Sequence, residues 1–153
     1  MSYILNSVTI RTNNTISGIK KIEELWKDIL NGKLPIIFNS EKILQKDISP
    51  ISKYSNYSSD ETGDYDLSIL GVNSDFFNQI ESDVQNGYYK KYDISDDNGN
   101  IELCTKKAWK TVWDDQKKGL IDRSFTTDYE CSIPSEYSKD GKSHCFLYIA
   151  LKQ

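Results

Sequence analysis

The stretch ISPISKYSNYSSDETGDYDLSILGV, residues 48–72, decides the fold. Apolar and polar residues alternate on both sides of the turn at 60–63, which is the pattern of two strands in an antiparallel hairpin. We expect strands over 48–59 and 64–72, with Gly63 supplying the positive φ that a tight turn needs. The sheet in this half of the chain is therefore expected to be antiparallel.

A strand and an amphipathic helix precede the hairpin. Residues 3–13 alternate apolar and polar side chains, as a half-buried strand does. Apolar residues then recur at helical spacing from Ile19 to Leu30, and Gly32 provides a residue that accepts the left-handed conformation of a helix end. Residues 35–47 fit neither pattern, and they could close a groove like a lid or pack against the outside.

The second half of the chain repeats this order. Strands are expected over 87–94, 124–133 and 144–152, and an amphipathic helix over 104–116 follows the first of them. A short linker element over 76–85 joins the two halves. Each half therefore follows the order strand, helix, strand, strand.

The repeated order predicts an α+β fold, a pseudo-twofold duplication of a βαββ unit within a single domain of residues 1–153. Repeat one covers about 3–74 and repeat two about 87–153. A doubled unit of this kind is expected to leave a ligand cleft between its halves. Aromatic residues make up 12% of the chain, and we expect some of them to line that groove around one acidic group.

Composition and motifs exclude several functions. A formal charge of −4 offers no basic field for phosphate backbones, so direct nucleic-acid binding is not expected. Neither a leader nor a long apolar segment is present, which favours a cytoplasmic protein without a membrane partner. No cofactor or metal is expected, because the sequence lacks a glycine-rich phosphate loop, HExxH and GxSxG.

Several segments resemble one known family. They are the tyrosine-rich hairpin at 54–65, the helix residues Ala108 and Trp109, the run RSFTTDYE at 123–130 and the strand FLYIAL at 146–151. Together they resemble the GyrI-like small-molecule-binding domains, which include effector-binding domains of bacterial transcription activators and integron cassette effector-binding proteins. The resemblance spans nearly the whole chain.

This resemblance implies an SHS2-like domain with a cleft for flat, often cationic, lipophilic compounds. It also implies that Glu130 meets the positive charge of the ligand. Some members of the family resemble hydrolases of reactive natural products, and others inhibit DNA gyrase. Two departures matter: no helix-turn-helix segment precedes Tyr3, and Ser58 follows Tyr57 where many members have a glutamate.

Strand geometry places Glu130 on the face opposite to Tyr129 and Cys131. If the face of Glu130 lines the cleft, its carboxylate is partly desolvated and suits a cation or a proton transfer. The alternative from spacing alone is a solvent-facing carboxylate paired with a lysine. The resemblance favours the cleft.

Aromatic residues complete the candidate site. Trp26 and Trp109 occupy the middle of the two helices, although a tryptophan on an apolar face is more often a core residue. Tyr54 and Tyr57 are three apart and should face opposite sides of the sheet, and we prefer Tyr57 for the cleft. The expected ligand-binding residues are Glu130, Tyr57, Trp26, Trp109, Tyr129 and Phe125, and no catalytic residue is assigned.

These residues predict a stand-alone module that binds or senses an aromatic or amphipathic, cationic small molecule. One alternative is a hydrolase in which Glu130 activates a water and a tyrosine polarises the leaving atom. Another is a module that binds a protein partner, either a regulator or DNA gyrase. An enzyme is the less favoured reading, since His144 and Cys145 should face opposite sides of one strand and cannot pair.

Overall fold

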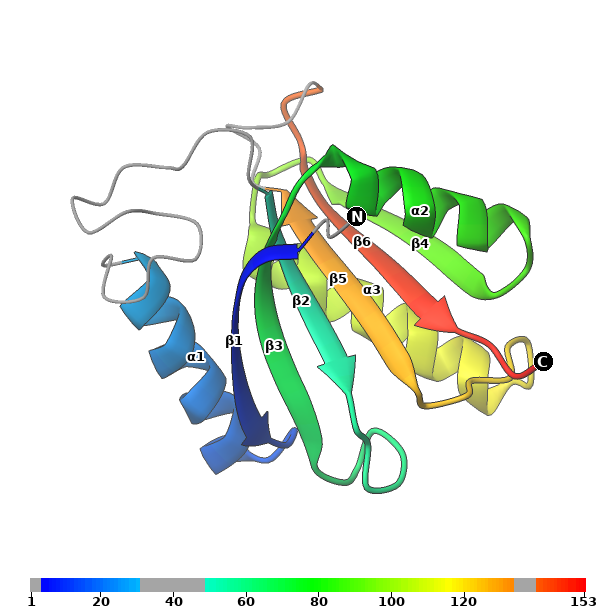
Figure 1. Ribbon diagram of the computed structural model, residues 1–153, viewed down its shortest axis with the longest axis horizontal. Coiled ribbons are helices and arrows are strands. Elements are labelled where there is room, and N and C mark those ends of the chain that lie inside the picture. The colour runs from blue at the N-terminus through cyan, green and yellow to red at the C-terminus, as the bar shows by residue number, and fades with distance from the viewer. Residues whose placement is uncertain (1–3, 31–48, 134–139) are drawn as a thin grey trace. The chain divides into compact units, whose positions relative to one another are not determined.

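The computed structural model describes residues 4–30, 49–133 and 140–153, and Figure 1 shows its helices and strands. The elements, in chain order, are β1 (Ile4–Thr12), α1 (Ile16–Leu30), β2 (Ser49–Ser55), β3 (Tyr65–Val72), α2 (Ser74–Gln85), β4 (Tyr89–Asp96), α3 (Ile101–Lys117), β5 (Thr127–Ile133) and β6 (Ser143–Ala150). The chain divides into two compact units, residues 1–79 and 80–153. Each unit contains one βαββ repeat, so the predicted α+β duplication is confirmed.

In the first unit, β3 lies between β1 and β2, and both neighbours are antiparallel to it. One face of α1 carries Leu25 and Ile29, which are buried against Leu67 and Ile69 of β3. A helix repeats every 3.6 residues and a strand every two, so each element can give one continuous apolar face to this contact. The expected end of α1 at Gly32 and the connection over 35–47 lie outside the described residues.

In the second unit, β6 lies between β5 and β4, again antiparallel to both. Cys104, Ala108 and Val112 of α3 are fully buried together with Leu147 and Ile149 of β6. The packing therefore repeats that of the first unit: one helix covers one face of a three-stranded antiparallel arrangement. None of the helices in the described parts of the chain has the length and apolar character that a membrane crossing requires.

The hairpin between β2 and β3 corrects two predictions. Gly63 does not have a positive φ; a Cβ there would lie 2.4 Å from Ser59 Oγ, so a larger residue would require that hydroxyl to move. The positive φ, 50°, belongs to Asn56. Because the chain turns there, Tyr54 and Tyr57 do not face opposite sides, and both rings contact Tyr65, at 5.4 and 6.0 Å between centroids.

Several elements differ from the prediction in kind or in bounds; β2, for example, ends at Ser55 and not at residue 59. The expected linker element over 76–85 is the helix α2, in which Ile80 is buried. β5 begins at Thr127 and not at residue 124, because Phe125 has a φ of 53° and interrupts the extended chain. α3 begins at Ile101, three residues before the expected start.

The early start of α3 has a local cause. Asn100 has an extended backbone, and its side-chain oxygen accepts a hydrogen bond from the backbone N–H of Leu103 at 3.0 Å. This contact satisfies one of the N–H groups that the first turn of a helix leaves without an intrahelical acceptor.

Replacing Asn100 by Ala should lower the free energy of unfolding by about 1 kcal/mol, because alanine cannot cap the helix. Urea denaturation monitored by circular dichroism measures the loss. Asn98→Ala, in the preceding turn, is the control and should change stability little. Equal effects of the two substitutions would contradict the capping role of Asn100.

Candidate functional site

A carboxylate and an indole meet in the second unit. Trp109 Nε1 donates a hydrogen bond of 2.7 Å to Glu130 Oε1, which joins the middle of α3 to β5. Ser132, two residues along β5 on the same face, lies with its Oγ 3.4 Å from Glu130 Oε2. Thr105, one turn before Trp109 on α3, is 3.2 Å from Ser132 Oγ. These four polar side chains form a continuous line between α3 and β5.

A buried ion pair lies beside this line. Arg123 Nη2 donates to Asp128 Oδ2 at 2.8 Å, and the two side chains are 1% and 0% exposed. Asp128 Oδ1 also accepts from the backbone N–H of Ala150 at 2.8 Å, and Arg123 Nη1 donates to Gln116 Oε1 at 3.2 Å. The pair therefore ties the start of β5 to the end of β6 and to the last turn of α3.

The guanidinium of Arg123 connects two predicted ligand-binding aromatics. It lies 4.3 Å from the ring centroid of Phe125 and 6.0 Å from that of Trp109. Both distances are within the range of a cation–π interaction. The structure thus brings together three of the predicted residues, Glu130, Trp109 and Phe125, around an arginine that the sequence analysis did not select.

We call Glu130, Trp109, Phe125, Arg123 and Asp128 the Glu130 cluster. It holds two carboxylates and one guanidinium, so its formal charge is −1. Glu130 is only partly buried, whereas the ion pair beside it is fully enclosed. A half-buried carboxylate among aromatic rings is suited to attract a cation, since water screens it less than it screens a surface carboxylate.

The cysteines near this cluster are not nucleophiles. Burial, with a further contribution from the charge of Glu130, raises the pKa of Cys131 to about 12. The same two causes raise the pKa of Cys145, and burial raises that of Cys104. All three cysteines are buried and reduced. They act as small apolar core residues, because a thiol attacks only as its thiolate.

The remaining predicted residues lie elsewhere. Tyr129 faces away from Glu130, as expected for adjacent strand residues, and packs against Tyr89 with 6.1 Å between ring centroids. Trp26 and Tyr57 belong to the first unit, where both pack at the edge of the core formed by α1 and β3. The expected groove between the halves stays a prediction, since the structure defines each unit by itself.

Sequence reasoning missed Arg123 and Asp128, although a signal was present. Only two of the 19 basic residues in the chain are arginines. An arginine in such a lysine-rich chain indicates a position that needs several donors in one plane. Asp128 lies within the quoted DYE run, but its sequence position does not reveal that it pairs with Arg123.

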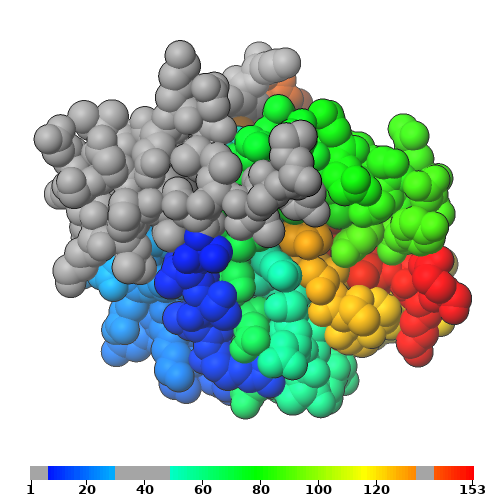
Figure 2. Space-filling model, viewed as in Figure 1, coloured from blue at the N-terminus to red at the C-terminus, as the bar shows by residue number. Residues whose placement is uncertain are grey.

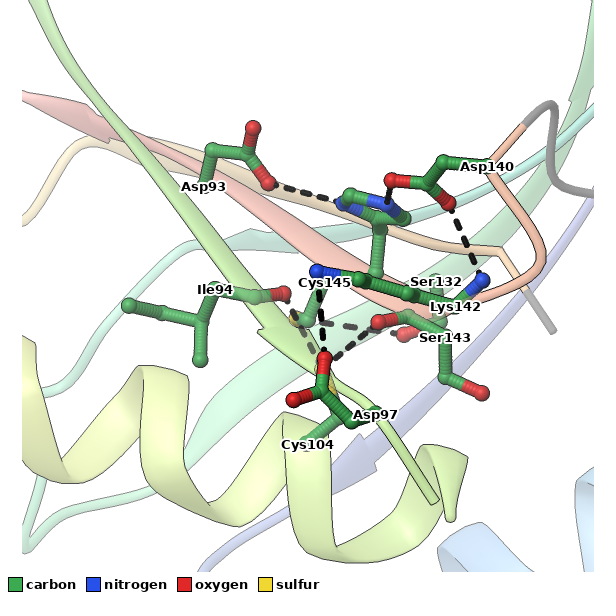
Figure 3. A network of polar contacts seen from close by, with 10 residues as sticks. Asp93, Ile94, Asp97, Cys104, Ser132, Asp140, Lys142, Ser143 and Cys145 are labelled. Atoms are coloured by element: carbon green, nitrogen blue, oxygen red, sulfur yellow. Dashed lines mark hydrogen bonds and ion pairs between the residues drawn. The ribbon is translucent and has the colours of Figure 1, made fainter. Parts of the chain in front are cut away.

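A second polar network lies on the other face of β4 and β6. His144 Nδ1 is 3.0 Å from Asp93 Oδ1, and His144 Nε2 is 2.7 Å from Asp140 Oδ2. Figure 3 shows the carboxylates of Asp93 and Asp140 on either side of the imidazole. The hydrogen bonds to Asp93 and Asp140 raise the pKa of His144. Within the described residues, no group of His, Cys, Asp or Glu side chains could hold a metal ion.

Comparisons with known proteins place this geometry in context. The chain matches no family model. It is 25% identical over 153 residues, 94% of this chain and 88% of the relative, to the Bacillus subtilis (strain 168) protein described as "Putative transcriptional regulator protein YobU". This similarity relates the chain to a regulator-type protein.

A solved structure shares the fold. An integron cassette protein from the mobile metagenome of Vibrio cholerae superposes with a TM-score of 0.62 at 20% identity, over 97% of this chain and 93% of that protein. At this identity the likeness shows the fold alone. Neither description names the GyrI-like family, so that assignment stays a prediction.

Replacing Asp128 by Asn should destabilise the chain by about 3 to 5 kcal/mol, because it leaves a buried guanidinium without its counter-charge. Urea denaturation gives the difference. Glu102→Gln is the matched control, since it removes a carboxylate from an exposed ion pair with Lys106. A loss for Asp128→Asn no larger than the control's would show that the buried pair contributes nothing to stability.

His144 should make stability depend on pH. Its pKa is raised in the folded chain, so its contribution is complete below the unfolded imidazole pKa of about 6.5 and is lost as the pH rises through the higher folded value. The difference in unfolding free energy between the wild type and His144→Gln should therefore shrink as the pH is raised above about 6.5. A difference that stays constant as the pH rises would contradict the ion-paired role.

Proposed function

We propose that this chain is a binding module for small aromatic or amphipathic cations, related to the effector-binding domains of transcription regulators. The observation that carries the proposal is the 2.7 Å hydrogen bond from Trp109 Nε1 to Glu130 Oε1. It holds a partly buried carboxylate at the edge of an indole ring. A cation that binds there can meet the carboxylate and an aromatic surface together.

The charges of the cluster support a cationic ligand. Asp128 balances the charge of Arg123 within a fully buried pair, so the formal charge of −1 in the cluster is that of Glu130. An anionic ligand would be repelled by this charge, and a neutral one would lack the charge-assisted hydrogen bond that Glu130 offers. Such a bond is worth about 1.5 to 3 kcal/mol.

The similarity to the Bacillus subtilis protein supports a role connected with regulation. In this proposal the described residues bind the effector, and a protein partner is one route by which binding could reach transcription. A regulator and DNA gyrase are the partners that the sequence resemblance suggests.

Binding is favoured over hydrolysis because the tyrosine adjacent to Glu130 in sequence is turned away from it. A hydrolase of the expected kind needs a tyrosine hydroxyl beside Glu130 to polarise the leaving atom. Tyr129, its neighbour in sequence, lies on the other face of β5 against Tyr89. An indole N–H and a hydroxyl both donate to Glu130 and help to hold the carboxylate in place.

Titration with cationic, neutral and anionic aromatic compounds, followed by tryptophan fluorescence, tests the proposal. Cationic compounds should quench the emission in a saturable way, because Trp109 lies in the cluster. Glu130→Gln should weaken their binding about tenfold or more, the equivalent of one charge-assisted hydrogen bond. The glutamine amide oxygen can still accept the hydrogen bond from Trp109, so the local structure is retained.

Glu102→Gln provides the control for this titration. It removes one negative charge from the exposed side of the same helix and should leave every affinity unchanged. The proposal is wrong if no cation quenches the emission, or if Glu130→Gln and Glu102→Gln have equal affinities. Turnover of a compound by the wild type and not by Glu130→Gln would favour the hydrolase.

A further inference from the structure

The face of the second unit that points away from α3 carries an unusual group of side chains. Alternate residues of β4 and β6, among them Lys91, Phe146 and Tyr148, point away from the core beneath α3. The end of α2 lies over this face and contributes Glu81. Figure 1 shows α2 and α3 on opposite sides of β4 and β6, and Figure 2 shows α2 at the surface.

The ammonium group of Lys91 is surrounded by one carboxylate and two rings. Its Nζ lies 2.6 Å from Glu81 Oε1, 5.3 Å from the ring centroid of Phe146 and 5.8 Å from that of Tyr148. The hydroxyl of Tyr148 donates to the same Glu81 oxygen at 3.0 Å. We call Glu81, Phe146 and Tyr148 the ammonium cage.

The cage keeps its carboxylate ionised and its phenol protonated. Burial alone would raise the pKa of Glu81, but the hydrogen bonds from Lys91 and Tyr148 lower it overall. Burial, and then the hydrogen bond to Glu81, raise the pKa of Tyr148 far above its ordinary value. A negative charge, a neutral hydroxyl and two ring faces are therefore presented to one position.

Aromatic rings with a nearby carboxylate form the arrangement that recognises organic ammonium groups in many binding sites. We propose that the ammonium cage is a binding site for a small organic ammonium compound, and that Lys91 occupies it in the absence of that ligand. The site uses none of the residues of the Glu130 cluster. It is therefore independent of the proposed function.

Lys91 is able to leave the cage. The Lys91 side chain is 33% exposed and that of Glu81 is 43% exposed, so solvent reaches both partners. Asp93 lies two residues along β4 on the same face, and its side chain is 51% exposed. When a ligand takes the place of the lysine ammonium at Glu81, Lys91 can turn toward Asp93 and keep a carboxylate partner.

The alternative is that Lys91 and Glu81 only tether α2 to β4. Titration with choline, followed by NMR of the aromatic side chains, separates the two. Lys91→Met keeps an unbranched side chain over the rings but removes the competing ammonium group. If Lys91 fills the cage in about nine molecules of ten, its removal should tighten choline binding about tenfold. The signals of Phe146 and Tyr148 should shift as choline binds.

Three matched controls test whether the gain in choline affinity depends on Lys91, on Glu81 and on the positive charge of the ligand. Lys90→Met removes the neighbouring lysine, whose Nζ lies 5.8 Å from the ring centroid of Tyr92 on the other face, and should not change the affinity. Adding Glu81→Gln to Lys91→Met should abolish the gain. The neutral isostere of choline, 3,3-dimethyl-1-butanol, should not bind.

The inference is overturned if Lys91→Met binds choline no better than the wild type, or if Glu81→Gln leaves the gain intact. Should Lys91→Met fail to fold, Lys91→Gln provides the same comparison, and Glu81→Gln in the wild-type background should weaken choline binding.

Glu130→Gln combined with Lys91→Met separates the two sites. Unchanged choline binding there supports a cage that is independent of the Glu130 cluster, and lost binding contradicts it.

Discussion

The ion pair between Arg123 and Asp128 is the constraint on which the second unit depends. A guanidinium withdrawn from water costs several kcal/mol unless its charge and its hydrogen bonds are satisfied. Asp128 balances its charge, Gln116 accepts a second hydrogen bond and the ring of Phe125 lies beside it, while the buried Nε has no hydrogen-bond partner among the described residues. The backbone at Phe125 has a positive φ, which costs about 1 to 2 kcal/mol for a residue with a side chain.

The buried position of the Arg123 guanidinium fixes several neighbouring contacts. The second oxygen of Asp128 accepts from Ala150, so the beginning of β5 is fixed against the end of β6. The ring of Trp109 lies over the guanidinium, and its N–H then points to Glu130. The position of the candidate ligand-binding carboxylate is therefore set by a pair of charges that no solvent or ligand reaches.

The sequence predicted the elements of the fold better than their ends. Periodicity identified α1, and the repeated order identified the duplication, because both depend on which side chains are apolar. The left-handed residues were not predictable in the same way. Asn56 and Phe125 have positive φ values because of the contacts that the folded chain makes around them. Residue type did not locate these positions, since it pointed to Gly63, which has no positive φ.

The same distinction applies to the candidate site. Strand alternation correctly placed Tyr129 and Glu130 on opposite faces. It could not indicate which residue of α3 meets Glu130, because that depends on how the helix lies on the strands. Two contacts depend on how separate segments pack against one another: that between Trp109 and Glu130, and that between Arg123 and Asp128. The spacing of residues along one element does not reveal them.

The lysines of β4 also affect how this strand meets a second molecule. Within the described strands of the second unit, β4 pairs with β6 alone and is therefore terminal. A terminal strand can template the addition of a strand from another molecule, which is how many β proteins begin to aggregate. Lys90 and Lys91 place one positive charge on each face of this strand, and a second copy brought alongside would have to bury or repel them. The lysine that occupies the proposed cage therefore also disfavours self-association through this strand.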